Sequence, residues 1–128
     1  MSLFKKIVGS SNKESTNSKI GWKPLIDLGQ LNEIVDFSNE KPVAIFKHST
    51  RCSISSTALN RLERAWKEEE SPAFLLDLIS FRSISQKIAE IFEIEHQSPQ
   101  VLVISNGQCI YSATHWDINM DEIKPHLN

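Results

Sequence analysis

From residue 22 onward, the apolar residues follow two alternating spacings. Short apolar runs rich in β-branched and aromatic residues predict strands, whereas apolar residues three and four apart predict helices with one buried face. The predicted strands cover residues 22–25, 43–46, 74–78, 101–104 and 109–113. The predicted helices cover residues 30–37, 53–70, 83–92 and 117–127. Pro24 interrupts the first strand, which is therefore expected at an edge of the sheet.

The predicted elements follow the order β-α-β-α-β-α-β-β-α. Strands that alternate with helices favour a mainly parallel sheet. Asn106-Gly107 lies between the last two strands and is the strongest short-range signal for a hairpin, which adds antiparallel strands at one side. We therefore expect an α/β fold with a central mixed sheet flanked by helices and a C-terminal β-hairpin and helix. This order resembles the thioredoxin fold, in which the active cysteine follows the central strand.

The first 21 residues differ in composition from the rest of the chain. Residues 9–21 are rich in Ser, Asn and Lys and are expected to form a linker or a loosely ordered arm. Residues 1–8 would place Leu3, Phe4 and Ile7 on one side of a short helix, although a frayed end is an equally good interpretation. Residues 22–128 are expected to form one thioredoxin-like domain, because a chain with 40% hydrophobic residues can build a real core at this length.

The charge and the termini exclude several classes of partner. A formal net charge of -2 and a sequence pI of about 6.1 give no bulk attraction to nucleic acid. No apolar stretch is long enough to span a bilayer, and no apolar segment of a secretory signal follows the first two lysines. We therefore expect a cytoplasmic protein without membrane association. Thiols stay reduced in that compartment, so Cys52 and Cys109 are expected to be catalytic or inert rather than joined in a structural disulfide.

Cys52 carries the clearest chemical signal. It lies between an apolar strand and a helical run, and a helix N-terminus offers free N–H groups and a partial positive charge that favour thiolate, the nucleophilic form. Ser55 stands three residues on, where a dithiol redox protein has its second cysteine. The pattern is therefore Cys-x-x-Ser, a one-cysteine redox centre, in which the Ser55 hydroxyl could donate a hydrogen bond to the Cys52 sulfur. The alternative is a cysteine that is merely buried, as free cysteines often are.

Three blocks of the sequence resemble a known family. They are residues 46–55 (Phe-Lys-His-Ser-Thr-Arg-Cys-Ser-Ile-Ser), 96–100 (His-Gln-Ser-Pro-Gln) and 114–118 (Thr-His-Trp-Asp-Ile), with a weaker match at 82–85 (Arg-Ser-Ile-Ser). Together they resemble the YtxJ-type monothiol bacilliredoxins, thioredoxin-fold proteins of the bacillithiol redox system that were formerly described as general stress proteins. The family usually has proline directly after the active cysteine, where this chain has Ser53. Ser53 keeps an N–H that could face a thiolate, so the acidity of Cys52 need not match that of the family.

The resemblance implies the removal of bacillithiol from cysteines of other proteins by thiol–disulfide exchange. The Cys52 thiolate would attack the bacillithiol sulfur of a mixed disulfide, which frees the client cysteine and leaves bacillithiol on Cys52. Ser55 cannot form a disulfide, so a second low-molecular-weight thiol or a disulfide reductase would regenerate Cys52. We expect no tightly bound cofactor, with bacillithiol as co-substrate and S-thiolated client proteins as partners.

Several residues around Cys52 are expected to line this site. In thioredoxin folds a cis-proline lies opposite the active cysteine, so Ser98-Pro99 is expected to be cis, although only ~5% of X–Pro bonds are. The backbone beside this proline would pair with the chain of the bound disulfide. Thr50, Arg51 and Lys47 flank the cysteine. A positive side chain, Arg51 being the best candidate, would favour thiolate and hold a carboxylate of the small thiol, unless it is a plain surface charge.

Two histidines and one tryptophan are further candidates. His48 and His115 could act near the site through their imidazoles, although His48 is slightly better interpreted as a structural hydrogen-bonding residue. Trp116 is either a stacking wall for a ligand or part of the core. The family resemblance favours His115 and Trp116 as site residues.

The remaining cysteine is expected far from the site. Cys109 begins the returning strand of the hairpin, and a rise of ~3.3 Å per residue places it on the order of 15 Å from Cys52. A disulfide needs Cα atoms within about 7 Å, so no bond between the two cysteines is expected within one chain. The 4 histidines and 2 cysteines match no usual zinc spacing, so no metal site is expected.

Other functions stay open on the sequence alone. Glutathione could replace bacillithiol, because both small thiols carry carboxylates. The chain could also be a non-catalytic thioredoxin-fold interaction module that holds a partner strand beside Pro99, or a redox sensor in which oxidation or capping of Cys52 changes its partners. Peroxidase chemistry is not expected, because Ile45 and Ser49 stand where a peroxiredoxin-type Pro-x-x-x-Thr-x-x-Cys pattern needs Pro and Thr.

Overall fold

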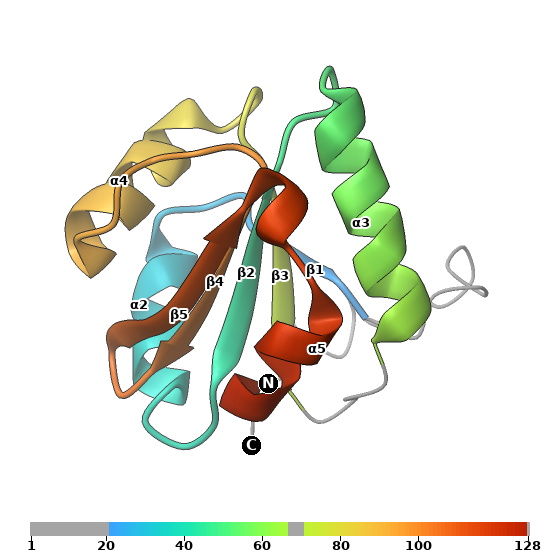
Figure 1. Cartoon of the computed structure of the whole chain (residues 1–128). Coiled ribbons are helices and arrows are strands. Elements are labelled where there is room, and N and C mark those ends of the chain that lie inside the picture. The colour runs from blue at the N-terminus through green and yellow to red at the C-terminus, as the bar shows by residue number, and fades with distance from the viewer. Residues whose placement is uncertain (1–20, 67–70, 128) are drawn as a thin grey trace.

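The protein folds as a single mixed sheet with helices on both faces (Figure 1). A computed structural model describes residues 21–66 and 71–127. The strands are β1 (Lys23–Pro24), β2 (Val43–His48), β3 (Ala73–Asp77), β4 (Gln100–Ser105) and β5 (Gln108–Thr114). The helices are α2 (Gly29–Phe37), α3 (Ser53–Ala65), α4 (Arg82–Phe92), α5 (Met120–Ile123) and the 3-10 helices η1 (His115–Asp117) and η2 (Lys124–Leu127). The α/β class predicted from the sequence is confirmed, whereas the predictions for residues 1–20 lie outside the described residues.

The central strand of the sheet is β2, which leads directly to Cys52. The strand order is β1-β3-β2-β4-β5. β1 and β2 run parallel to β3, whereas β4 runs antiparallel to both β2 and β5. β1 pairs only through Lys23 and Pro24 at the edge of the sheet, as the proline predicts. The central strand therefore carries its last residue, His48, to the edge of the sheet at which the candidate site begins.

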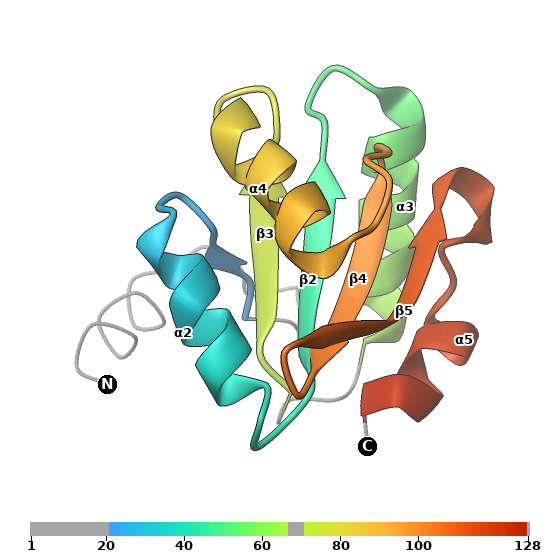
Figure 2. The same cartoon turned by 90° about the vertical axis from the view of Figure 1, so that its left-hand side faces the viewer.

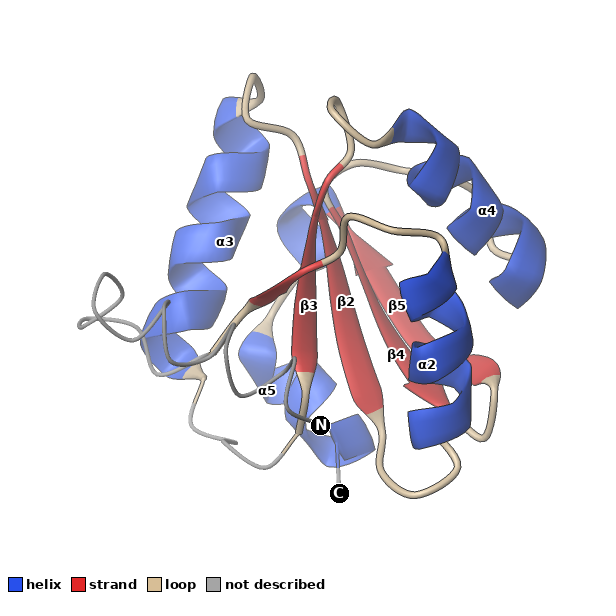
Figure 3. Ribbon diagram, turned by 180° about the vertical axis from the view of Figure 1, so that it is seen from behind, coloured by secondary structure: helices blue, strands red, loops and turns tan. Residues whose placement is uncertain are grey.

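Alternate side chains of β2 enter two separate cores. Ala44 and Phe46 pack with residues of α3 and α5, whereas Val43 and Ile45 pack with residues of α2 and α4. Figure 2 and Figure 3 show these helix pairs on opposite faces of the sheet. A strand covered on both faces needs a continuous apolar run, which explains why this segment does not alternate with polar residues.

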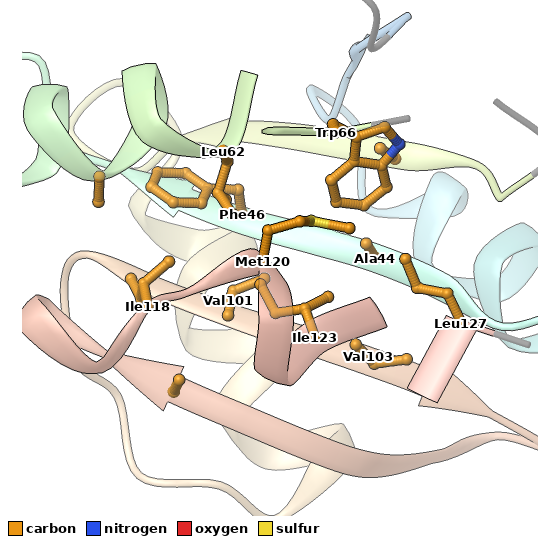
Figure 4. Packing of buried hydrophobic residues seen from close by; sticks show 13 residues of the cluster. Ala44, Phe46, Leu62, Trp66, Val101, Val103, Ile118, Met120, Ile123 and Leu127 are labelled. Atoms are coloured by element: carbon orange, nitrogen blue, oxygen red, sulfur yellow. The ribbon is translucent and has the colours of Figure 1, made fainter. Parts of the chain in front are cut away.

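The core under α3 and α5 fixes the helix that begins at Cys52. Phe46 and Leu62 meet in its centre, and Met120 approaches from α5 (Figure 4). Fully burying a side chain of this size contributes roughly 1.5–3 kcal/mol. These contacts hold α3 against the central strand and so fix the direction from which its N-terminus approaches the site.

The helix that follows Cys52 is shorter than predicted. α3 ends at Ala65 rather than at residue 70, because Trp66 takes an extended backbone conformation and buries its ring in the core. The Trp66 ring lies 6.1 Å from that of Trp22, between centroids. Residues 67–70 lie outside the described residues. Tertiary burial of one large side chain therefore ends the helix earlier than its periodicity indicates.

The predicted C-terminal helix is broken into short pieces. η1, α5 and η2 replace one helix over residues 117–127. The break comes at Ile118, which is buried in an extended conformation, and at Asn119, whose side chain accepts a hydrogen bond from the Asp121 N–H at 2.8 Å and begins α5. No helix in the described part of the chain is long and apolar enough to cross a membrane.

The hairpin prediction is confirmed, and it places Cys109 away from the active-site end. Asn106 and Gly107 both have positive φ, 52° and 75°, as a type I′ turn requires. Cys109 pairs with Ile104, and Ile104 pairs with Val43 at the start of β2. Because Cys52 follows the other end of β2, the two cysteines lie at opposite ends of the sheet, and both are free.

Candidate active site

Cys52 occupies the position that caps the N-terminus of α3. It is the N-cap residue, with extended dihedrals of φ -113° and ψ 120°. Its N–H donates to the Ser49 carbonyl at 3.2 Å, and its own carbonyl accepts from the Ser56 N–H at 3.1 Å. No side chain of the described residues makes a capping hydrogen bond to this helix. A thiolate at this position can therefore accept hydrogen bonds from the free N–H groups of the first turn, as a capping oxygen would.

Ser55 faces the protein interior and holds the turn rather than the sulfur. Its hydroxyl is fully buried, lies 2.6 Å from Nδ1 of His48 and accepts the Ser49 N–H at 3.0 Å. The hydrogen bond to Cys52 suggested by the sequence is not the one formed. The reason is that α3 turns this side chain toward the end of β2, where His48 offers a partner. His48 is thus the structural hydrogen-bonding residue that the sequence slightly favoured.

Burial also changes the proton affinity of His48. Loss of hydration lowers the pKa of His48, while the negative charges of Asp77 and Glu63 partly oppose that effect. When Nδ1 of the neutral imidazole carries no proton, it accepts a hydrogen bond from the Ser55 hydroxyl, and in the other tautomer Nδ1–H donates to the same oxygen. The pair therefore joins the strand before Cys52 to the helix after it.

Pro99 lies at the same end of the sheet as Cys52. The Ser98–Pro99 peptide bond is cis, as predicted. Gln100, the next residue, pairs with Lys47 on β2, so Pro99 is level with the last residue of the central strand. The Pro99 carbonyl accepts a hydrogen bond from the His115 N–H at 3.1 Å. Ser98 has a buried hydroxyl without a hydrogen-bond partner among the described residues.

The corner formed by His115 and Trp116 borders the site. His115 has a positive φ of 53° and begins η1, which contacts α3. Trp116 is 63% exposed, so the alternative that it belongs to the core is wrong. An exposed indole next to the Pro99 segment offers an apolar wall to a bound chain or a small thiol.

The two positively charged residues near Cys52 in the sequence differ in their exposure to solvent. Thr50 and Arg51 are exposed on the turn before Cys52. Lys47 has no exposed surface and points to the opposite face of the sheet from His48, where its Nζ lies 2.7 Å from Nδ1 of His96. Of the two cations that flank the cysteine in the sequence, Arg51 alone has an exposed side chain.

The sequence did not reveal that the buried side chains of Lys47, Ser85 and Gln100 contact residues 95 and 96, of which the His96 side chain is exposed on its outer side. Lys47, Ser85, His96 and Gln100 all lie in the sequence blocks that resemble the family, but the blocks do not indicate which of these residues meet. No group of three or more potential metal-ligating His, Cys, Asp or Glu residues gathers within residues 21–66 and 71–127.

The central strand, the Cys52 turn and the adjacent cis-proline together define a thioredoxin-fold thiol oxidoreductase. A solved structure described as a putative oxidoreductase with a thioredoxin fold matches with a TM-score of 0.71 and 26% identity, covering 80% of this chain and 90% of that chain. Two thioredoxins share the fold at lower identity. The reduced Schistosoma mansoni thioredoxin pre-protein has a TM-score of 0.63 and 18% identity over 81% of this chain and 96% of its own. The Malassezia sympodialis thioredoxin has a TM-score of 0.65 and 17% identity over 82% and 90%.

A narrower assignment comes from the sequence family. The family model described as monothiol bacilliredoxin BrxC matches residues 23–123. The chain belongs to this family. The match spans the Cys52 turn, the Pro99 segment and the His115-Trp116 corner, so the resemblance stated from three sequence blocks is confirmed.

Proposed function

We propose that the protein removes bacillithiol from S-thiolated client proteins and that Cys52 is the nucleophile. The observation that supports the proposal is that a single thiol lies at the site, as the locations of three residues show. Cys52 caps α3 and is partly exposed, Ser55 fills the second-cysteine position with a buried hydroxyl, and Cys109 lies at the other end of the sheet. A site of this kind can exchange one disulfide but has no second thiol nearby to resolve it within the chain.

The proposed step is a balanced thiol–disulfide exchange. The Cys52 thiolate attacks the bacillithiol sulfur of the mixed disulfide, a new S–S bond joins Cys52 to bacillithiol, and the bond to the client sulfur breaks. The client cysteine leaves as a thiolate and takes a proton from water. The first-turn N–H groups of α3 stabilise negative charge on the attacking sulfur.

The surrounding residues have distinct roles in this proposal. Backbone groups beside Pro99 would pair with the client chain, and Ser98, which directly precedes Pro99, would lie beside the same chain. Arg51 and Thr50 would hold a carboxylate of bacillithiol through a charged and a hydroxyl donor. His115 and Trp116 would form the wall against which the bound group packs.

The reaction needs a second partner to complete its cycle. After transfer, Cys52 carries bacillithiol, and another low-molecular-weight thiol or a disulfide reductase would release it. We propose that this occurs in the cytoplasm, where small thiols keep the client pool reduced. No tightly bound cofactor takes part in the proposed step.

Mass spectrometry of disulfide transfer tests this function. A model protein capped with bacillithiol, and the same protein capped with glutathione, would be incubated with the wild type, Cys52→Ser and Cys109→Ser. We expect the bacillithiol cap to move to the wild type and to Cys109→Ser, but not to Cys52→Ser. Cys109→Ser is the matched control because it removes the other thiol of the chain.

The outcomes separate the competing functions. Faster transfer from the glutathione-capped protein would replace bacillithiol by glutathione as the co-substrate. No transfer from either protein, with Cys52 reduced and the fold intact, would reject the enzyme function and leave an interaction module or a redox sensor. Transfer that persists in Cys52→Ser would assign the reaction to another residue.

A further inference from the structure

Lys47 is a buried cation without an acidic partner. Its side chain has 0% exposed surface, and no carboxylate of the described residues pairs with it. Burial of an ammonium group without a counter-charge costs stability, because the hydration it loses is not replaced by an ion pair. Structural residues rarely carry that cost, so the position of Lys47 calls for an explanation in terms of what it contacts.

The contact of Lys47 is with the segment that leads to Pro99. Its Nζ lies 2.7 Å from Nδ1 of His96, and the Ser85 hydroxyl lies 3.1 Å from the same nitrogen. His96 belongs to the connection between α4 and β4, of which we call residues 95–99 the proline segment. His96 itself is exposed on the remaining side, so Lys47 and Ser85 hold its inner nitrogen from the core.

A second buried side chain, on the strand paired with that of Lys47, also binds the proline segment. Gln100 is the cross-strand partner of Lys47, and its Nε2 donates to the Glu95 carbonyl at 3.1 Å. Neighbouring residues on two paired strands thus bind neighbouring residues of the proline segment. The far end of this segment, the Pro99 carbonyl, then accepts the His115 N–H. A continuous set of contacts connects the central strand to the wall of the candidate active site.

We propose that Lys47 is a positioning residue for disulfide exchange, which acts through His96 to fix the proline segment opposite Cys52. Lys47 does not touch the substrate, because no part of it reaches the surface. Its role is to set where the backbone beside Pro99 receives the client chain. The inference deepens the proposed function and rests on it, since it assigns this residue to the same exchange reaction.

A purely structural role predicts a different result from a positioning role. If Lys47 only stabilised the fold, replacing it would lower stability and reduce all activities in proportion to the folded fraction. If it positions the proline segment, Lys47→Met should fold at least as stably as the wild type but exchange disulfides more slowly. Displacement of a reacting group by a small distance is sufficient to lower a rate by roughly 10- to 100-fold.

The test compares two reactions of the same thiol in Lys47→Met. One is exchange with the bacillithiol-capped protein, which needs the proline segment, and the other is alkylation of Cys52 by iodoacetamide, which does not. We expect the exchange rate constant to fall by about tenfold or more, and the alkylation rate to stay within about twofold of the wild type. Lys87→Met is the matched control, since Lys87 is an exposed lysine on α4, and it should change neither rate.

Variants of His96 provide an independent arm. His96→Leu removes the acceptor for Lys47 and should slow exchange as Lys47→Met does. His96→Asn places an amide oxygen near the position of Nδ1 and should restore most of the rate. Exchange at the wild-type rate in both Lys47→Met and His96→Leu would overturn the proposal, as would an equal loss of alkylation, which would place the effect on Cys52 itself.

A structural readout separates this inference from the proposed function. If the wild type transfers neither cap, the proposed function fails, and the positioning role is then judged by hydrogen exchange of the His115 amide. That N–H is bound to the Pro99 carbonyl, so its exchange should accelerate in Lys47→Met and not in Lys87→Met. Unchanged exchange of this amide would reject the positioning role as well.

Discussion

The Ser55 hydroxyl lies 2.6 Å from Nδ1 of His48, which ties the first turn of α3 to the end of the central strand. The same oxygen accepts the Ser49 N–H at 3.0 Å. The turn that carries Cys52 is therefore held from the inside by the residue that replaces a second cysteine. In this one-cysteine site, position 55 has a structural use even though it supplies no thiol.

Replacing Ser55 by alanine should destabilise the fold. The change leaves the Ser49 N–H and the His48 ring nitrogen without their buried partner, a loss that costs about 1–3 kcal/mol. Chemical denaturation measures the difference in the free energy of unfolding. Ser56→Ala, on the exposed side of the same turn, is the control and should change that free energy by less than about 0.5 kcal/mol. Equal effects of the two substitutions would contradict the role given to the buried hydroxyl.

The sequence predicted the site well wherever local pattern determines position. Cys52 lies at a strand-to-helix turn because an apolar run precedes it and helical spacing follows it, and both signals are local. The order of the elements and the resemblance to the thioredoxin fold predict that Pro99 lies near Cys52. The hairpin turn followed from Asn106-Gly107, whose residue types suit positive φ.

The parts that could not be predicted depend on contacts across the fold. Periodicity indicates that Lys47 and His48 face opposite sides of the sheet. It does not indicate that Lys47 contacts His96 on one side or that His48 contacts Ser55 on the other. In the same way, the direction of the Ser55 hydroxyl depends on how α3 packs. The helix end at Ala65 depends on the burial of Trp66, which a helical pattern does not reveal.

Lys47 should make stability depend on pH above neutrality. Burial lowers the pKa of Lys47 to about 8 from 10.5. The Lys47 amine contacts Nδ1 of His96, and the positive charge of Arg82 acts on that same histidine. Between these two values the unfolded chain binds a proton that the folded chain has released, so stability rises as pH rises. Below about pH 8 Lys47 is protonated in both the folded and the unfolded state. The buried charge then lowers the free energy of unfolding by its full amount, about 3 kcal/mol.

Unfolding measured from pH 7 to 11 in the wild type and Lys47→Met checks this prediction. Lys47→Met should be the more stable protein at pH 7, and its advantage should shrink as pH rises through that window. Other groups that titrate there, such as Tyr111, are present in both proteins and cancel in the difference. A difference in unfolding free energy that stays constant over this pH range would be inconsistent with a buried, titrating lysine.

The two cysteines should differ in reactivity toward thiol probes. Burial raises the pKa of Cys109, although backbone hydrogen bonds with Tyr111 and Val103 partly oppose it, and its thiol donates to the Tyr111 carbonyl at 3.3 Å. At neutral pH it should therefore stay a protected thiol. A limiting amount of N-ethylmaleimide should give one adduct, which peptide mapping places on Cys52. Rapid labelling of Cys52→Ser would contradict the protection of Cys109. A Cys52–Cys109 disulfide in the folded oxidised protein would contradict the arrangement of the sheet.

Replacing Trp116 by alanine should slow disulfide exchange without unfolding the protein. Its indole is 63% exposed, so truncation removes little buried surface and should change the unfolding free energy by about 0.5 kcal/mol or less. If the indole is the wall of the site, the exchange rate with a capped client protein should fall several-fold. Alkylation of Cys52 by iodoacetamide should remain unchanged, because that small probe needs no wall.

A matched substitution near the start of β5, the strand that leads to η1, separates an effect on the site from a general loss of exposed apolar surface. Ile110 is 44% exposed and lies beside Cys109, in the part of β5 paired with the end of β4 near the hairpin turn. Ile110→Ala should therefore leave the exchange rate at the wild-type value. Equal slowing by Ile110→Ala and Trp116→Ala would mean that the exposed indole has no special place in client binding. An effect confined to Trp116→Ala would assign the client-facing side of the site to the corner that His115 joins to Pro99.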